Sequence, residues 1–207
     1  MDLRKRFKGW KAEIKNHKYL ILLSLVFLVL ATFLDYFAGS YVRKVGSAVS
    51  PDLILDHIAP INLSFLFVYG YITIILILFL YPLLFKVRKF HMVISQFSLL
   101  IMVRSFFIIF THLKTPVDAI AVKFPWMISY LSFQNDLFFS GHTAVPFLGF
   151  LIFKGRIRYF FLAASIAMGA IVLLMHLHYS IDVLSAFFIT YGTYKIGVWF
   201  FKKINHY

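Results

Sequence analysis

Six apolar runs follow one another along the chain, and short polar segments separate them. The runs occupy residues 20–34, 63–85, 92–113, 142–153, 160–175 and 181–201. A helix needs about 20 mostly apolar residues to cross a bilayer, and it satisfies its backbone hydrogen bonds internally. The pattern therefore predicts an all-α integral membrane protein, built as a bundle of six transmembrane helices.

The composition agrees with a membrane location. Hydrophobic residues make up 61% of the 207 residues and charged residues only 14%, whereas an ordinary soluble domain is about one quarter charged. So few charges cannot cover a water-facing surface. We expect residues 1–18 to form a basic cytoplasmic N-terminal segment and residues 19–207 to form a single six-helix membrane domain.

Basic residues gather at the ends of alternate runs and predict the orientation of the chain. Lysine and arginine exceed aspartate and glutamate by 21 − 8 = 13. If the N-terminus is cytoplasmic, the outer segments hold only Arg43, Lys44, Lys114 and Lys123. The positive-inside rule then predicts that both termini are cytoplasmic. Attraction to anionic lipid accounts for the basic N-terminus, and we expect no nucleic-acid partner.

Polar side chains within or beside the apolar runs are candidates for function, because polar groups are costly at membrane depth. The chain has no cysteine, which leaves histidine and aspartate to do any chemistry. In the predicted orientation Arg104, His142, His178 and Asp182 all lie toward the outer face. We therefore expect an extracytoplasmic site.

The segment His178-Tyr179-Ser180-Ile181-Asp182 places an imidazole and a carboxylate four residues apart. Residues at this spacing share a helix face. Asp182 can then accept a hydrogen bond from one ring nitrogen of His178 and leave the other free to attack or to take a proton. The alternative is a buried pair that only holds helices together.

The segment Ser140-Gly141-His142-Thr143 opens the fourth run. Free N–H groups and the positive end of a helix dipole make an anion site there, which phosphate would suit; the alternative is an ordinary serine N-cap. Residues 142–154 would cover roughly 20 Å of a hydrocarbon core about 30 Å thick. The site is therefore expected roughly 10 Å below the outer surface, at the depth of lipid phosphates rather than of soluble metabolites.

The two histidine segments, preceded by Asn135-Asp136-Leu137-Phe138-Phe139, resemble the C-terminal catalytic segment of sphingomyelin synthases. These enzymes are a branch of the PAP2 lipid phosphatase and phosphotransferase superfamily. The region from Arg104 through Thr111 to Pro116-Val117 is similar to the family's third-span motif. The resemblance covers the chain from about Pro51 to the C-terminus.

This resemblance implies a six-helix catalytic domain with no metal and no other cofactor. It implies phosphoryl chemistry in which His178 attacks phosphorus through a phosphohistidine intermediate, His142 protonates the leaving oxygen, and Asp182 orients His178. We expect Arg104, Asp136, Ser140 and Gly141 to bind the substrate. For Arg104 the alternative is an ion pair with an aspartate such as Asp136 or Asp118, and for Asp136 it is an exposed interfacial position.

The chain departs from the phosphatase branch in its cationic residues. It has no Arg-Pro dipeptide, and Val172 stands six residues before His178, where that branch has an arginine. Arg104 is the main cationic contact that remains. A phosphomonoester carries a charge near −2 and benefits from several cationic clamps, so the low number of clamps favours a diester.

Three functions are consistent with the sequence. The first is a metal-independent phosphotransferase or phosphodiesterase acting on a phospholipid head group, with a neutral lipid such as ceramide or diacylglycerol as acceptor. The second is a PAP2-type lipid phosphate phosphatase. The third is a non-catalytic channel, scramblase or assembly factor.

Several further polar residues have weaker claims. Asp52, Asp56 and His57 are either loop ligands for a cation or, as is more common, loop caps. His112 and His176 are expected at the solvent edge.

Overall fold

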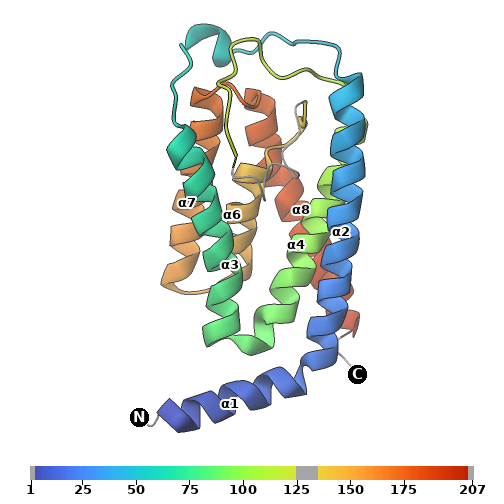
Figure 1. Ribbon diagram of the computed structural model, residues 1–207, viewed down its shortest axis with the longest axis vertical. Helices are drawn as coiled ribbons and strands as arrows, with labels where there is room; N and C mark the ends of the chain where they lie inside the picture. The colour runs from blue at the N-terminus through green and yellow to red at the C-terminus, as the bar shows by residue number, and fades with distance from the viewer. Residues whose placement is uncertain (1–2, 125–134, 205–207) are drawn as a thin grey trace.

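The computed structural model describes residues 3–124 and 135–204, and helices dominate this part of the chain. Each of the six apolar runs forms a helix, and the helices pack side by side as a bundle (Figure 1). Their bounds are α2 (Lys18–Val45), α3 (Tyr71–Phe85), α4 (Val87–Ile109), α6 (Gly141–Ile152), α7 (Arg156–Leu174) and α8 (Ser180–Ile204). A π-helical turn (Leu66–Gly70) leads into α3, a short 3₁₀ helix (Leu55–His57) lies in the preceding loop, and α1 (Leu3–Asn16) precedes the bundle.

Four helices in the described residues are long and apolar enough to cross a membrane. They are α2, the continuous segment Leu66–Phe85, α4 and α7, whereas α6 is a shorter apolar helix. Large apolar side chains stay exposed on the outside of the bundle, among them Phe33 and Phe188. An apolar surface of this extent is costly in water and suits contact with lipid. The fold therefore has the character of a multi-pass membrane protein.

Helix α2 continues eleven residues beyond the first predicted run, which stops before Asp35. The carboxylate of Asp35 accepts hydrogen bonds of 3.2 Å from Arg104 and from the Ser105 hydroxyl. These partners compensate a charge that would otherwise be expensive among apolar side chains. The helix therefore continues to Val45 with Asp35 in its interior.

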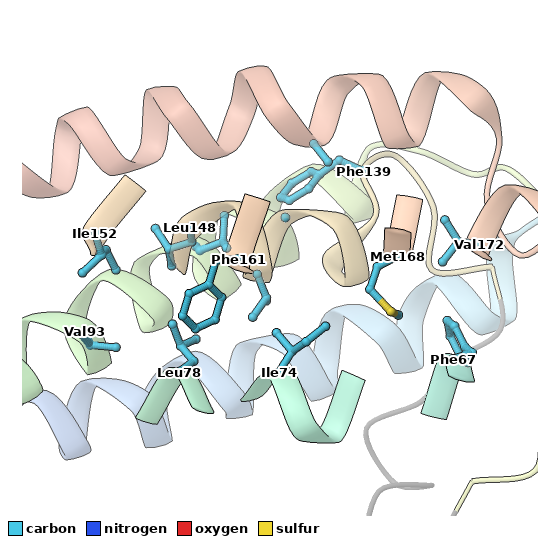
Figure 2. Packing of buried hydrophobic residues seen from close by; sticks show 14 of the residues in the cluster. Phe67, Ile74, Leu78, Val93, Phe139, Leu148, Ile152, Phe161, Met168 and Val172 are labelled. Carbon is cyan, nitrogen blue, oxygen red and sulfur yellow. The ribbon is translucent and has the colours of Figure 1, made fainter. Parts of the chain in front are cut away.

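Short helix α6 lies in the middle of the bundle, packed against α7 and α8. Figure 1 shows that it begins below the ends of α7 and α8 that its N-terminus faces. Leu148 of α6 and Phe161 of α7 are fully buried in the main core, and Figure 2 shows them with Leu78 and Ile74 of α3. Gly149 permits this packing, because a Cβ there would lie 2.5 Å from the Phe161 ring.

The two ends of the bundle differ. Helix α1 lies across the end at which α8 also finishes (Figure 1), where Trp10 donates a 2.8 Å hydrogen bond to the Leu83 carbonyl. Two guanidinium nitrogens of Arg88 on α4 donate hydrogen bonds to the carboxylate of Glu13 on α1. The loops 46–65 and 110–124 cover the opposite end, which we call the loop end.

We predict that Gly149→Ala destabilises the bundle by about 1–3 kcal/mol, because the added methyl overpacks the contact with Phe161. Gly192→Ala on α8 is the matched control. No atom lies within 4 Å of a Cβ at that position, so alanine there should leave stability unchanged or raise it through helix propensity. Thermal unfolding of the two purified variants in detergent measures the difference. Equal midpoints for the two variants would contradict the packing argument.

Candidate active site

His178 and Asp182 form the expected hydrogen-bonded pair, but they do not share a helix face, because His178 lies just before α8, which begins at Ser180. His178 Nδ1 donates to Asp182 Oδ2 at 3.2 Å, and the backbone N–H of Tyr179 donates to the same oxygen at 3.1 Å. Asp182 is fully buried and His178 is 6% exposed. Because Nδ1 donates its N–H to the carboxylate, Nε2 is the ring nitrogen that this hydrogen bond leaves free.

His142 stands in the first turn of α6, opposite this pair. Ser140 caps the helix, as its side chain accepts from the Thr143 N–H at 3.4 Å. The His142 ring packs against Phe67 and Tyr71, with ring centroids 4.3 and 4.2 Å apart. These aromatic contacts hold the imidazole against the π-helical turn and the start of α3.

The two imidazoles face one another across a short gap, with ring centroids 6.5 Å apart. The Ser140 N–H donates to the Asp182 carbonyl at 3.0 Å, which joins the start of α6 to the first turn of α8. At this separation one small tetrahedral group can contact both rings. The arrangement provides a nucleophile or base with its orienting carboxylate on one side and a second acid or base on the other.

Arg104 lies beside this gap and forms two ion pairs. Its guanidinium donates to Asp35 at 3.2 Å and to Asp136, and it is 8% exposed. For Arg104, the sequence analysis considered a substrate clamp or an ion pair with an aspartate such as Asp136. The structure contains the ion pair with Asp136. Asp118 is not its partner; it lies in a cavity at the loop end.

One nitrogen of Arg104 is still unpaired within the described residues. Its Nε has no hydrogen-bond partner there and points at Gly141, where a Cβ would lie 3.1 Å away. Glycine therefore lets the guanidinium approach the first residue of α6. A role in substrate binding stays a prediction for Arg104, Asp136, Ser140 and Gly141.

Several buried polar atoms near the start of α6 have no partner among the described residues. They include Arg104 Nε, Asp136 Oδ1, Thr143 Oγ1 and Asp182 Oδ1. A buried polar atom without a hydrogen bond costs about 1–3 kcal/mol, and such atoms commonly indicate a missing water or ligand. Arg104 Nε and Asp182 Oδ1 belong to residues beside the two histidines, whereas Thr143 Oγ1 faces Gly169 of α7.

Asp35 and Asp52 support the site. The sequence analysis did not identify Asp35, and it identified Asp52 as a possible loop cap but not as a cap of α8. An acidic residue at the end of an apolar run is the signal that points to Asp35. Asp52 comes from the loop after α2, and its Oδ2 accepts from the N–H and the hydroxyl of Ser180 at 2.7 and 2.8 Å. It therefore caps α8 from a distant part of the chain.

Tyr179 also connects the segment before α8 to the loops. Its hydroxyl donates to the Lys114 carbonyl at 2.9 Å and accepts from the Ser50 N–H at 3.2 Å. Both residues that follow His178 are therefore anchored to the loops. His176 is also buried, although the sequence placed it at the solvent edge, whereas His112 is exposed as expected.

Comparisons of the chain with protein-family models, with curated proteins and with solved structures found no match. The chemistry of the site therefore has to be argued from its geometry.

We predict that Asp52→Ala raises the hydrogen-exchange rate of the Ser180 amide by about tenfold or more, the effect of losing a helix cap worth about 0.5–2 kcal/mol. Asp118→Ala is the control, because that exposed carboxylate has no hydrogen bond or ion pair within the described residues. Mass spectrometry of peptides spanning residues 176–183 gives the measurement. Unchanged exchange in the Asp52 variant would contradict the capping role.

The same carboxylate predicts an acid transition. Burial disfavours its charge, but hydrogen bonds from Leu55, Ser180 and Ile54 outweigh burial and hold the pKa of Asp52 below its usual range. Because the pKa of Asp52 is lower in the folded state, its carboxylate stabilises the protein fully at pH values above the unfolded pKa of about 3.9. This contribution is lost as the pH falls through the folded pKa. Thermal unfolding should therefore show a fall below about pH 4 that is smaller in Asp52→Ala.

Proposed function

We propose that the chain is a metal-independent membrane phosphotransferase or phosphodiesterase that acts on a phospholipid head group. The observation that carries the proposal is the facing pair of imidazoles, one oriented by Asp182 and the other at the N-terminus of α6. Unpaired buried atoms of Arg104 and Asp182 beside the two histidines support a polar ligand. The apolar bundle around it supports a ligand with lipid tails.

In the proposed reaction His178 Nε2 attacks the phosphorus of the lipid diester. A nitrogen–phosphorus bond forms, the bond from phosphorus to the lipid oxygen breaks, and His142 gives its proton to that oxygen. Asp182 stabilises the charge that develops on the His178 ring. His142 then removes the proton of an incoming hydroxyl, whose oxygen takes the phosphoryl group and releases His178.

Charge around Arg104 favours a diester over a monoester. Asp35 and Asp136 both pair with the guanidinium, so this cluster is formally negative rather than positive. A dianionic monoester would need several cationic partners to compensate its charge, while a monoanionic diester needs fewer. A lipid phosphate phosphatase is therefore the second candidate. A non-catalytic membrane protein is the third, in which the same pairs would only hold helices together.

The proposal includes six membrane spans with both termini in the cytoplasm. The spans would be α2, Leu66–Phe85, α4, α6, α7 and α8. Basic residues at the α1 end then face the cytoplasm, in line with the positive-inside rule. The site at the start of α6 would open toward the extracytoplasmic leaflet.

We predict that His142→Ala, His178→Ala and Asp182→Asn each lower turnover by about 100-fold or more, the usual effect of removing a positioned acid, base or nucleophile. The double histidine variant should be little worse than either single variant, because the groups act as a unit. His112→Ala is the matched control, since this exposed histidine lies outside the site. EDTA should not change turnover. Full activity in any of the three single variants would exclude the mechanism.

Trapping of an intermediate tests attack by His178, and the product formed with an added acceptor separates a transferase from a hydrolase. His142→Ala should retain label from a head-group-labelled phospholipid on the protein as an acid-labile, base-stable phosphoramidate, because the base for the second step is missing. Adding ceramide or diacylglycerol to the wild type should give a new labelled lipid. Inorganic phosphate from a monoester as the sole product would favour the phosphatase. No turnover of any phospholipid or lipid phosphate would favour the non-catalytic alternative.

Sidedness can be tested because the chain has no cysteine. We predict that Ser47→Cys and Lys123→Cys, both exposed at the loop end, react with a membrane-impermeant thiol reagent added outside. Lys8→Cys and Arg156→Cys lie toward the other end and should react only after the membrane is permeabilised. The reverse pattern would place the site on the cytoplasmic side.

A further inference from the structure

An apolar groove lies at the end of the bundle that α1 crosses, where α2 begins and α8 finishes (Figure 1). Helix α4 packs against both α2 and α8, and side chains of all three helices line the groove. Its walls are mainly apolar and include Leu20 and Phe27 of α2, Met92 of α4 and Phe201 of α8. None of the candidate active-site residues lines this α1-end groove, so it is a separate feature.

The size and surroundings of the α1-end groove suit a hydrocarbon chain. Its volume is about 290 Å³, near the lower limit of the roughly 300–1,000 Å³ typical of small-molecule sites. Two of its lining residues, Leu23 and Phe200, are 58% and 51% exposed, so the groove opens onto the apolar outer surface of the bundle. A helix with its side chains is about 10–12 Å wide. The groove therefore suits a single acyl chain better than a helix of a second copy.

One polar group in the wall of the groove has no partner. Ser95 is buried and lines the groove, and its hydroxyl forms no hydrogen bond within the described residues. A helical serine can donate to a carbonyl of the preceding turn, as Ser24 and Ser98 do. The Ser95 hydroxyl is therefore available to a group that enters the groove. His91, one helical turn closer to α1, also lines the groove.

The chain around this end of the groove is strongly basic. Residues 3–18 contain seven lysines and arginines and one acidic residue, whose carboxylate is already paired with an arginine of α4. Lys15 and Lys18 are exposed and form no ion pair within the described residues. The rings of His17 and His91 stack with their centroids 6.0 Å apart. This contact brings the polar end of the groove beside the junction of α1 and α2, which carries both lysines.

We propose that the α1-end groove binds an anionic phospholipid, with one acyl chain held between α2 and α8. The phosphate lies at the end of the groove near His91, where Lys15 and Lys18 supply the opposing charge. The ester carbonyls of a phospholipid lie between its phosphate and its chains, so one of them reaches the Ser95 hydroxyl and accepts its hydrogen bond. General attraction of basic residues to an anionic surface selects no single position, whereas the groove does. This inference rests on the membrane character of the fold and not on the proposed function.

Native mass spectrometry of the purified full chain in uncharged detergent tests the proposal. We expect one phosphatidylglycerol molecule to bind at least about tenfold more tightly than phosphatidylcholine with the same chains, because the lysines favour an anionic head group. Phosphatidylglycerol with a photoreactive diazirine in one acyl chain should label peptides that contain residues 20–27, 91–95 and 200–201. Equal affinity for the two lipids, or labelling spread evenly over the outer face of α2, would overturn the proposal.

A groove-filling variant tests where the acyl chain binds. Leu20→Trp places a larger side chain in the groove and should lower the affinity for phosphatidylglycerol by about tenfold or more, as loss of buried chain methylenes does. Leu22→Trp makes the same change at an exposed position of α2 outside the groove and should bind as the wild type does. Thermal unfolding checks that both variants fold. Wild-type affinity in folded Leu20→Trp would contradict the proposal, and the labelling pattern of the wild type decides the question if this variant does not fold.

Charge variants test the head group. The double variant Lys15→Gln, Lys18→Gln should reduce the preference for phosphatidylglycerol over phosphatidylcholine to about twofold or less, while the affinity for phosphatidylcholine stays unchanged. The double variant Lys114→Gln, Lys123→Gln removes the same charge at the loop end and should keep the full preference. An equal loss of preference in both double variants would show a general effect of charge and would overturn the site.

A variant of Ser95 tests the hydrogen bond to the ester. Wild-type protein should bind ester-linked phosphatidylglycerol about threefold more tightly than the ether-linked lipid, the value of a weak neutral hydrogen bond. Ser95→Ala should remove this difference. Ser98→Ala, three residues further along α4 and outside the groove, should keep it. Equal binding of the two lipids by the wild type would overturn this placement of the phospholipid.

Discussion

Asp182 connects the start of α6, which carries His142, with the segment before α8, which carries His178. Its carboxylate orients His178 and accepts the Tyr179 N–H, and its carbonyl accepts the N–H of Ser140, the residue that caps α6. A single residue at the start of α8 therefore sets both the direction of one imidazole and the distance to the other. The carboxylate is fully buried, so loss of its hydrogen-bond partners would leave an uncompensated charge. The arrangement that keeps these partners in place is therefore favoured.

Small residues allow the helices to come close enough for this geometry. Gly149 lets α6 pack against the Phe161 ring. Gly169 lets α7 approach α8, because a Cβ there would lie 3.0 Å from Val183. Close backbone approach at small residues is a common way to pack helices in lipid, where no hydrophobic force drives them together. Short α6 is thus held between α7 and α8 at a depth where its N-terminus lies inside the bundle.

Apolar periodicity and i,i+4 spacing predict much of this structure, because they express local physics. The six runs become helices, and His178 and Asp182 pair, although His178 lies before α8 and not on its face. What local patterns cannot show is which distant residue compensates a polar group. The extension of α2 past Asp35 depends on Arg104, and the start of α8 depends on Asp52, more than 120 residues earlier.

Loop contacts make the candidate active site dependent on the loop end of the bundle. Tyr179 and Ser180 directly follow His178, and three loop residues hold them: Ser50, Asp52 and Lys114. The direction of the His178 ring therefore depends on loop residues that are far away in the sequence as well as on Asp182.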